Sequence, residues 1–161
     1  PYTVRTVVGF GTFNTDLLEE ERHALVDNCV RRLELDVIAD RRLSDLSGGE
    51  QRRTAIARTL AHGTDLILLD EPTDSLDLGH ASLVSRIVRE EAAGGATIVS
   101  TGHDLNLAAR FADRIVMLNA GSIVADGTPA DVLTEERLEA VYECAVHVTT
   151  HPDDGGPVVY L

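Results

Sequence analysis

The sequence predicts an α/β fold with a mostly parallel central sheet, a helical part ahead of it and a C-terminal β-hairpin. Two apolar runs, residues 66–69 and 97–101, have the length and composition of parallel strands buried on both faces. A helical pattern over residues 81–93 separates them, which makes a βαβ unit with a right-handed crossover. A Pro/Asp/Gly turn at 152–157 lies between two short apolar stretches and predicts the terminal hairpin.

The helical part is predicted from residues 15–45, after a lead-in segment at residues 1–14 in which positions 2–8 are apolar and β-branched. Thr15 is the expected N-cap of its first helix, with acidic residues in the first turn. Apolar residues then recur on one face to about Leu35, namely Leu18, Leu25, Val26, Cys29, Val30 and Leu33. Residues 37–43 predict a second, short helix.

The central stretch combines a helix start with an acidic strand end. Ser47, Gly48 and Gly49 open a helical run, and a helix N-terminus with small residues offers free N–H groups and a positive dipole end to a phosphate. The strand at residues 66–69 ends in Asp70 and Glu71, the position where α/β proteins place their chemistry. Pro72 ends this strand, and residues 75–77 form the loop into the next helix.

The second half of the chain continues this alternation of elements. Residues 105–111 predict a helix, and residues 114–118 and 123–127 predict a hairpin around a turn. Thr128 and Thr134 are each expected to cap a helix, the second of which runs to about Tyr142.

Composition restricts the partners of this protein. The 27 acidic and 14 basic residues give a net charge of −13, which argues against nucleic acid as a primary partner. All the basic residues are arginines, since the sequence has no lysine. This acid-rich, lysine-free composition resembles that of cytoplasmic proteins of extreme halophiles or of organisms with GC-rich genomes. Ordinary compositional drift is the alternative explanation. Apolar runs are too short to cross a bilayer, so we expect membrane contact only through a partner. Cys29 and Cys144 are expected to be buried in a reducing compartment.

Three segments resemble motifs of the ATP-binding subunits of ABC transporters. Residues 46–50 read Leu-Ser-Gly-Gly-Glu like the signature motif, residues 66–71 resemble the Walker B strand, and residues 75–77 resemble the D-loop. The resemblance implies a P-loop NTPase-like fold in which residues 46–161 are part of one ABC ATPase domain. Residues 103–133 further resemble the importers of iron-siderophore, haem and cobalamin compounds.

The resemblance also implies a site for ATP and Mg²⁺. Glu71 and His103 would be catalytic: the glutamate orients or deprotonates the attacking water, and the histidine reaches the γ-phosphate from the neighbouring strand. Asp70 would hold Mg²⁺ through water. The resemblance implies five further residues at the two ATP sites of a dimer. They either contact the ATP that a second subunit mainly holds or couple one ATP site to the other, and they are Ser47, Gly48, Gly49, Glu50 and Asp77.

The partners implied by the family are a second ATPase subunit and a membrane permease. Two ATPase subunits form a head-to-tail homodimer, and the helical subdomain touches the permease at the cytoplasmic face of the membrane. A substrate-binding protein acts with them indirectly.

The missing lysine leaves the nucleotide site incomplete. A P-loop needs a Lys that reaches the β- and γ-phosphates, so no P-loop lies in this sequence. We therefore expect the C-terminal part of a longer ATPase, incomplete at its N-terminus and inactive alone, although removal of an initiator Met before Pro1 stays open. The alternative is a shortened, non-catalytic partner domain that supplies the signature in trans. A chromosome-maintenance or repair ATPase fits poorly, because coiled-coil heptads and a basic face are missing.

Overall fold

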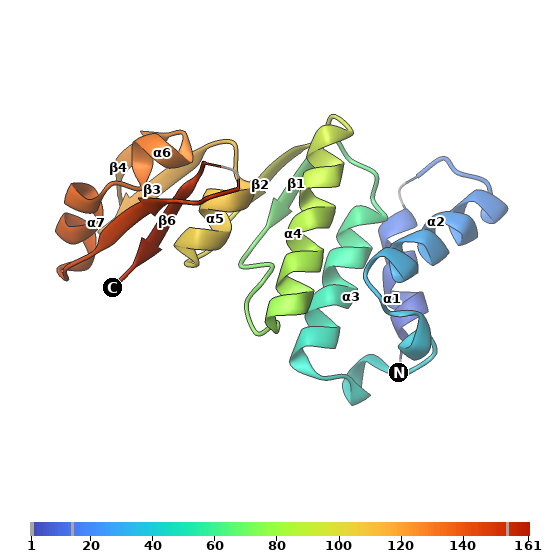
Figure 1. Ribbon diagram of the computed structural model, residues 1–161. Helices are drawn as coiled ribbons and strands as arrows, with labels where there is room; N and C mark the ends of the chain where they lie inside the picture. The colour runs from blue at the N-terminus through green and yellow to red at the C-terminus, as the bar shows by residue number, and fades with distance from the viewer. Residues whose placement is uncertain (1, 14, 154) are drawn as a thin grey trace. The chain divides into compact units, whose positions relative to one another are not determined.

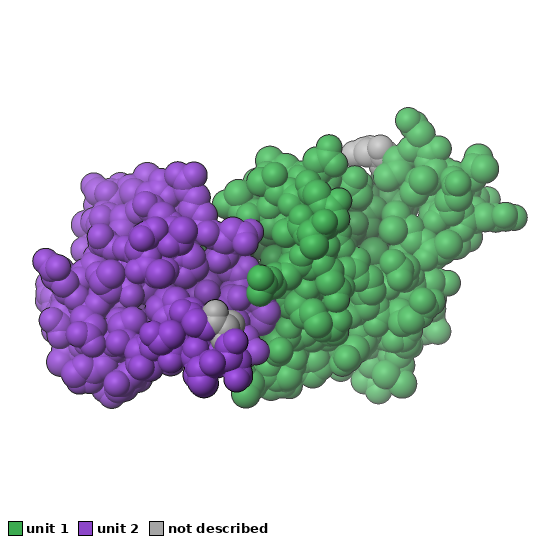
Figure 2. All heavy atoms as spheres, turned by 45° about the horizontal axis from the view of Figure 1, so that its top comes forward, with its two compact units in different colours: residues 1–102 green, residues 103–161 purple. Residues whose placement is uncertain are grey.

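The computed structural model describes residues 2–13, 15–153 and 155–161, which divide into two compact units (Figure 2). Unit 1 comprises residues 1–102 and unit 2 comprises residues 103–161, and each has a hydrophobic core of its own. Among the described residues, no helix is both long enough and apolar enough to span a membrane.

Unit 1 begins with two short helices, α1 (Val4–Gly9) and the 3-10 helix η1 (Phe10–Thr12). Thr3 caps α1, since its hydroxyl accepts a hydrogen bond from the N–H of Thr6 at 3.2 Å. Val4 and Val8 are fully buried. The sequence assigned no element to this β-branched stretch; the cap and the burial of one face account for the helix.

Helix α2 spans Glu19–Arg32, so the prediction of Thr15 as its N-cap is wrong. The Thr15 hydroxyl donates instead to the carbonyl of Thr12 at 2.7 Å, which ties it to the end of η1. Glu21 takes over the capping, because its carboxylate accepts the N–H of Leu18 at 2.8 Å. The predicted apolar face is confirmed in Val26, Cys29 and Val30, whereas Leu18 is exposed.

The end of α2 lies three residues before the expected position at Leu35. Glu34 adopts a left-handed backbone with φ of 53°. Its N–H donates to the carbonyl of Arg31, and the N–H of Leu35 donates to Val30, each at 3.0 Å. This is a Schellman ending, which satisfies the last carbonyls of the helix and buries Leu35 completely.

The short helix expected at residues 37–43 is wrong as well. Two 3-10 turns stand there, η2 (Asp36–Ile38) and η3 (Leu43–Asp45). Backbone groups between them bond to the start of the chain: Val4 donates to Arg41 and Leu43 donates to Tyr2, each at 3.0 Å. Because these groups are used in tertiary contacts, they cannot form a continuous helix.

The βαβ unit is confirmed (Figure 1). Helix α3 (Gly48–Leu60) precedes β1 (Leu66–Leu69), and α4 (Leu78–Ala93) connects β1 to β2 (Thr97–Ser100). The two strands pair in parallel, with Leu66 opposite Thr97 and Leu69 opposite Ser100.

Burial of these strands on both faces is contradicted for the described residues. Ile67 and Leu69 are buried, but Leu66 and Leu68 on the other face are 54% and 66% exposed, and Val99 of β2 is 55% exposed. Alternate side chains point to opposite faces of a strand, and the described core covers one of them.

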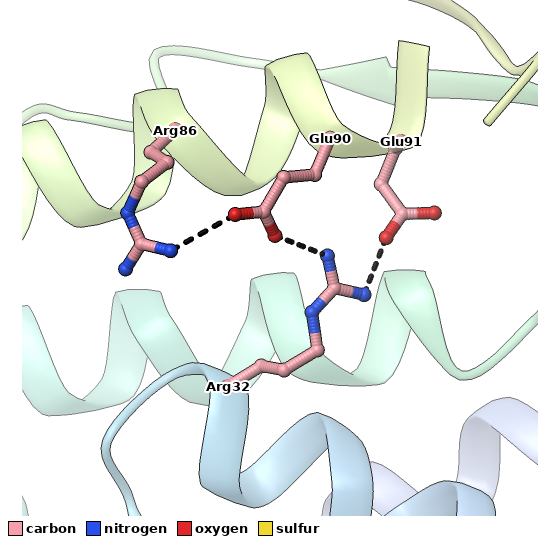
Figure 3. A network of polar contacts seen from close by, with 4 residues as sticks. All are labelled: Arg32, Arg86, Glu90 and Glu91. Atoms are coloured by element: carbon pink, nitrogen blue, oxygen red, sulfur yellow. Dashed lines mark hydrogen bonds and ion pairs between the residues drawn. The ribbon is translucent and has the colours of Figure 1, made fainter. Parts of the chain in front are cut away.

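An ion-pair network joins α2 to α4 (Figure 3). The guanidinium of Arg32, at the last position of α2, donates to Glu91 at 2.5 Å and to Glu90 at 3.1 Å. Arg86 contacts the other oxygen of Glu90 at 2.9 Å. The Glu91 and Glu90 carboxylates raise the pKa of Arg32 against the opposing effect of burial.

The described residues of unit 2 form two antiparallel hairpins and three short helices, which confirms both predicted hairpins. The first hairpin pairs β3 (Ile115–Asn119) with β4 (Ser122–Gly127), and the terminal hairpin pairs β5 (His147–Thr150) with β6 (Pro157–Tyr160). The helices are α5 (Leu105–Phe111), α6 (Pro129–Val132) and α7 (Glu135–Tyr142). In the described part of the chain only the β1–β2 pair is parallel.

The two cysteines have different environments. Cys29 is 2% exposed in the core of unit 1, and burial raises the pKa of its thiol to about 11. Cys144 is exposed, which corrects the expectation that both would be buried. It follows Glu143, which ends α7 with a left-handed φ of 56°.

Candidate functional site

The N-terminus of α3 is held by a reciprocal capping box. The Ser47 hydroxyl accepts the N–H of Glu50 at 3.3 Å, and the Glu50 carboxylate accepts the N–H of Ser47 at 2.7 Å. The backbone hydrogen bond from Ser47 lowers the pKa of Glu50. The glutamate is therefore engaged in shaping the helix start, and Gly48 lies at the first helical position with open space where a Cβ would stand.

Gly49 lies against the loop that follows β1. A Cβ at this position would come within 3.3 Å of Leu76 Cδ2 and 3.4 Å of the Ser75 carbonyl oxygen. Ser75 itself has a left-handed φ of 61°, an uncommon conformation for a residue with a side chain. The helix start and the loop thus approach each other closely because glycine has no side chain.

A shallow depression about 380 Å³ in volume lies between α3 and this loop. Its lining residues are Gly48, Gln51, Arg52, Ala55 and Ser75. Arg52 also donates to the carbonyl oxygen of Asp70 at 3.2 Å, so one arginine connects α3 to the end of β1. The depression is polar and cationic, which suits an anionic group.

The end of β1 is organised by Thr101, which directly follows the neighbouring strand β2. The Thr101 hydroxyl donates to Asp70 Oδ1 at 2.6 Å and accepts the N–H of Glu71 at 3.0 Å. The N–H of Thr101 donates to the carbonyl of Leu69 at 2.9 Å, which continues the parallel pairing by one step. Glu71 has a left-handed φ of 45°, so the chain turns sharply just where the second carboxylate begins.

Asp77 caps α4 and contacts a histidine. Its Oδ1 accepts the N–H of His80 and its Oδ2 lies by His80 Nδ1, both at 2.8 Å. The backbone hydrogen bond from His80, followed by the side-chain bond, lowers the pKa of Asp77. The carboxylate is therefore an oriented anion at the helix start, and its side chain remains 68% exposed.

A family model described as "ABC transporter" matches residues 3–74, which include the capping box, β1 and the turn at Glu71. Over these residues the chain matches the ABC transporter family. It is 44% identical over 161 residues to the hemin import ATP-binding protein HmuV of Rhodococcus jostii (strain RHA1), and 42% identical over 162 residues to that of Streptomyces coelicolor. The alignments cover 98% and 99% of this chain but only 55% and 58% of the relatives, so the chain spans little more than half their length.

Solved ABC transporter structures have the same fold. A structure described as an inward-facing metal-chelate type ABC transporter is 27% identical, with a TM-score of 0.82 over 99% of this chain and 65% of that one. A dimeric bacterial ABC transporter cassette is 31% identical, with a TM-score of 0.71 over 80% of this chain and 57% of that one. The predicted ABC ATPase fold is therefore confirmed.

Unit 1 contains most of the site residues that the sequence indicated. Signature-like residues 47–50 face the D-loop-like residues 75–77, and Asp70 and Glu71 share Thr101. His103 opens unit 2, just ahead of α5, whose N-cap is Asp104. Its approach to Glu71 stays a prediction.

Three residues that contact the candidate site were missed by the motifs: Thr101, Arg52 and His80. Thr101 had a sequence signal, because it ends the strand parallel to β1 and so reaches the same sheet edge as Asp70. Arg52 had none, since its contact with Asp70 arises only in the folded chain, and His80 lies three residues after Asp77 within the first turn of α4.

The donor set at Asp70 fits a hydrated Mg²⁺ ion only in part. A carboxylate oxygen is the ligand type that Mg²⁺ prefers, and Mg²⁺ is commonly held by one or two carboxylates together with water and nucleotide phosphates. The described residues contain no group of three or more His, Cys, Asp or Glu that could hold a metal ion. Asp70 thus fits one position of a shell completed by water and phosphate.

Proposed function

We propose that this chain is part of the ATP-binding and ATP-hydrolysing subunit of an ABC importer. The observation that carries the proposal is the shared threonine at the end of β1, which holds Asp70 and the backbone of Glu71 at one sheet edge. Two differently placed carboxylates beside an anion-compatible helix start are what phosphoryl transfer to water requires.

Each predicted residue then has a role in hydrolysis. Glu71 orients the attacking water and accepts its proton, and His103 donates to the γ-phosphate. Asp70 would hold Mg²⁺ through water, and the bound ion would supply positive charge beside the phosphates. Ser47, Gly48 and Gly49 offer hydrogen-bond donors to the ATP of a second subunit, with Glu50 fixing this helix start and Asp77 coupling the two sites.

The phosphate-binding lysine comes from outside these 161 residues, because the chain has no lysine. We place the complete subunit as a head-to-tail dimer on the cytoplasmic face of the membrane, bound to permease subunits and served by a substrate-binding protein. The names of the relatives and of the metal-chelate type transporter support haem, an iron-siderophore or a cobalamin-type chelate as the cargo.

Substitution of Glu71 tests this function. In the complete protein, Glu71→Gln should leave ATP binding unchanged and abolish steady-state hydrolysis, because the amide keeps the shape but cannot accept the proton. Binding is measured with a fluorescent ATP analogue and hydrolysis by phosphate release. Undiminished hydrolysis in the variant would overturn the assignment.

The absence of lysine also favours a second candidate, a shortened partner domain that offers only its signature helix. This chain, added to a complete ATPase subunit, would then stimulate ATP hydrolysis by that subunit. Ser47→Arg should remove the stimulation, because it replaces the small cap residue with a bulky side chain. A lack of stimulation by the unaltered chain would dismiss this candidate.

A further inference from the structure

Helix α5 lies against the terminal hairpin of unit 2 (Figure 1). Leu105 and Ala109 of α5 pack against the core of this unit, as do Val148 and Val159 of the hairpin. Apolar contacts of this kind hold the helix on the hairpin, but they are not directional and leave its rotation and its height along the strand undefined. A directional contact is what defines the position of the helix start.

Asn106 makes a directional contact of this kind. Its side-chain amide donates to the carbonyl of Val159 at 2.9 Å and accepts the N–H of Val159 at 2.7 Å. One side chain thus bonds both backbone groups of a strand residue, as a residue of a neighbouring strand would. In the described part of the chain β6 pairs with β5 alone, so this amide occupies the open edge of β6. We call the Asn106–Val159 pair the clamp.

The other edge of the hairpin is bonded to α7. Val148 lies directly across from Val159, and its N–H donates to the carboxylate of Glu135, the first residue of α7, at 2.9 Å. The Glu139 carboxylate accepts the N–H of Val146 at 3.4 Å. Side chains of two helices therefore hold the hairpin from both edges, and β6 is a fixed support for α5.

His103 lies three residues before Asn106. Between them, Asp104 is the N-cap of α5, and its Oδ1 accepts the N–H of Leu107 at 2.9 Å. The cap fixes the direction in which the chain enters the helix, and the clamp fixes the helix on β6. Because both contacts lie within three residues of His103, they define the position of its backbone relative to the hairpin.

We propose that Asn106 is a positioning residue for ATP hydrolysis that acts through His103, a proposal that rests on the proposed function, in which His103 donates to the γ-phosphate. The terminal hairpin then contributes to hydrolysis without contacting ATP: β6 holds α5 through the clamp, and α5 holds the histidine. Loss of the clamp displaces His103 and leaves the groups that bind ATP and Mg²⁺ unchanged, because those residues belong to unit 1.

The test measures steady-state ATP hydrolysis by the complete protein. Asn106→Asp keeps the shape and the acceptor for the Val159 N–H, but it places a carboxylate oxygen against the Val159 carbonyl. An acid in the first turn favours α5 itself, so the helix stays formed. We expect kcat to fall about tenfold, as for a small displacement of a catalytic group, and KM for ATP to stay unchanged.

Two controls separate positioning from a general loss of structure. Asn119→Asp makes the same chemical change at an exposed asparagine at the end of β3, and it should leave kcat unchanged. Val132→Ala removes buried methyl groups from the core of unit 2. It should lower the thermal midpoint more than Asn106→Asp does and still retain kcat, because it leaves the clamp intact.

A double variant tests the route through His103. In single-turnover measurements, which resolve slow residual hydrolysis, Asn106→Asp should cause no further loss once His103 is replaced by alanine, since the two residues then act as one unit. A further tenfold loss in the double variant would overturn the proposal, as would an undiminished kcat in Asn106→Asp or an equal fall in Val132→Ala. Hydrolysis by the unaltered complete protein is measured first: its absence would refute the proposed function, whereas its presence together with a normal kcat in Asn106→Asp would refute only the role of Asn106.

Discussion

Thr101 connects the two carboxylates at the end of β1. A hydroxyl can donate and accept at once, and here it donates to Asp70 while it accepts from the N–H of Glu71. Asp70 and Glu71 therefore do not orient independently. A residue outside every recognised motif sets the geometry on which the proposed water activation depends.

Loss of this hydroxyl should slow ATP hydrolysis more than it weakens ATP binding. Thr101→Val keeps the shape and removes both hydrogen bonds, and a hydrogen bond to a charged group contributes about 1.5–3 kcal/mol. If this free energy is added to the activation barrier of hydrolysis, kcat of the complete protein falls roughly tenfold to hundredfold. Thr101→Ser, which retains the hydroxyl, is the control and should retain most of the rate. Equal rates for the valine and serine variants would show that Thr101 has no positioning role.

At the scale of elements, the sequence predicted the regular pieces well and their boundaries less well. The four-residue apolar run of β1 and the glycine pair at the start of α3 are local signals, and both elements stand where they were expected. The predicted start of α2 was wrong because Thr15 belongs to the preceding turn, where its N–H and its hydroxyl both donate to the carbonyl of Thr12, and the helix begins only at Glu19. Whether Thr15 or Glu21 caps the helix depends on the direction of the chain in the preceding turn, and no local sequence pattern determines that direction.

The same reasoning explains the strand faces and the site. An apolar run shows that Leu66 to Leu69 prefer burial, but it does not show which face the described helices will cover. Asp70, Glu71 and Ser47 were recognisable from motif order. Arg52 was not, since its partner Asp70 lies at the end of another element, and His80 was not, although its partner Asp77 is the N-cap of the same helix.

The Arg32 network supplies a prediction about how α2 is held on α4. Arg32→Gln leaves Glu90 and Glu91 as neighbouring carboxylates without their shared cation, and half-exposed networks of this kind contribute about 1 kcal/mol. Arg86→Gln is the matched control. The Arg86 side chain is 61% exposed and pairs with Glu90, one turn further along the same helix, and ion pairs of this kind contribute about 0.3–0.5 kcal/mol. Urea unfolding of the complete protein should show the larger loss for Arg32→Gln. A greater loss at Arg86 would mean that the contact between helices adds no stability.

At the scale of the whole molecule, charge is the dominant feature. The net charge of −13 is carried by 27 acidic residues, and only some of them have an arginine partner. Unpaired carboxylates such as Glu19 and Glu20 repel one another and destabilise a compact chain. The same charge argues against nucleic acid and favours basic partners.

This excess of acid predicts that salt stabilises the protein. Raising KCl from 0.1 M to 1 M shortens the Debye length from about 10 Å to about 3 Å and so screens the repulsion between carboxylates. Salt also weakens the Arg32 network, but one network worth about 1 kcal/mol is outweighed by repulsion spread over many acids. The thermal midpoint at pH 7, followed by circular dichroism, should therefore rise by several degrees. Near the sequence pI of 4.7 the net charge vanishes, so the same increase in KCl should leave the midpoint nearly unchanged. A fall at pH 7, or an equal rise at both pH values, would show that repulsion among these acids does not limit stability, and the halophile-like composition would then have no physical consequence in this chain.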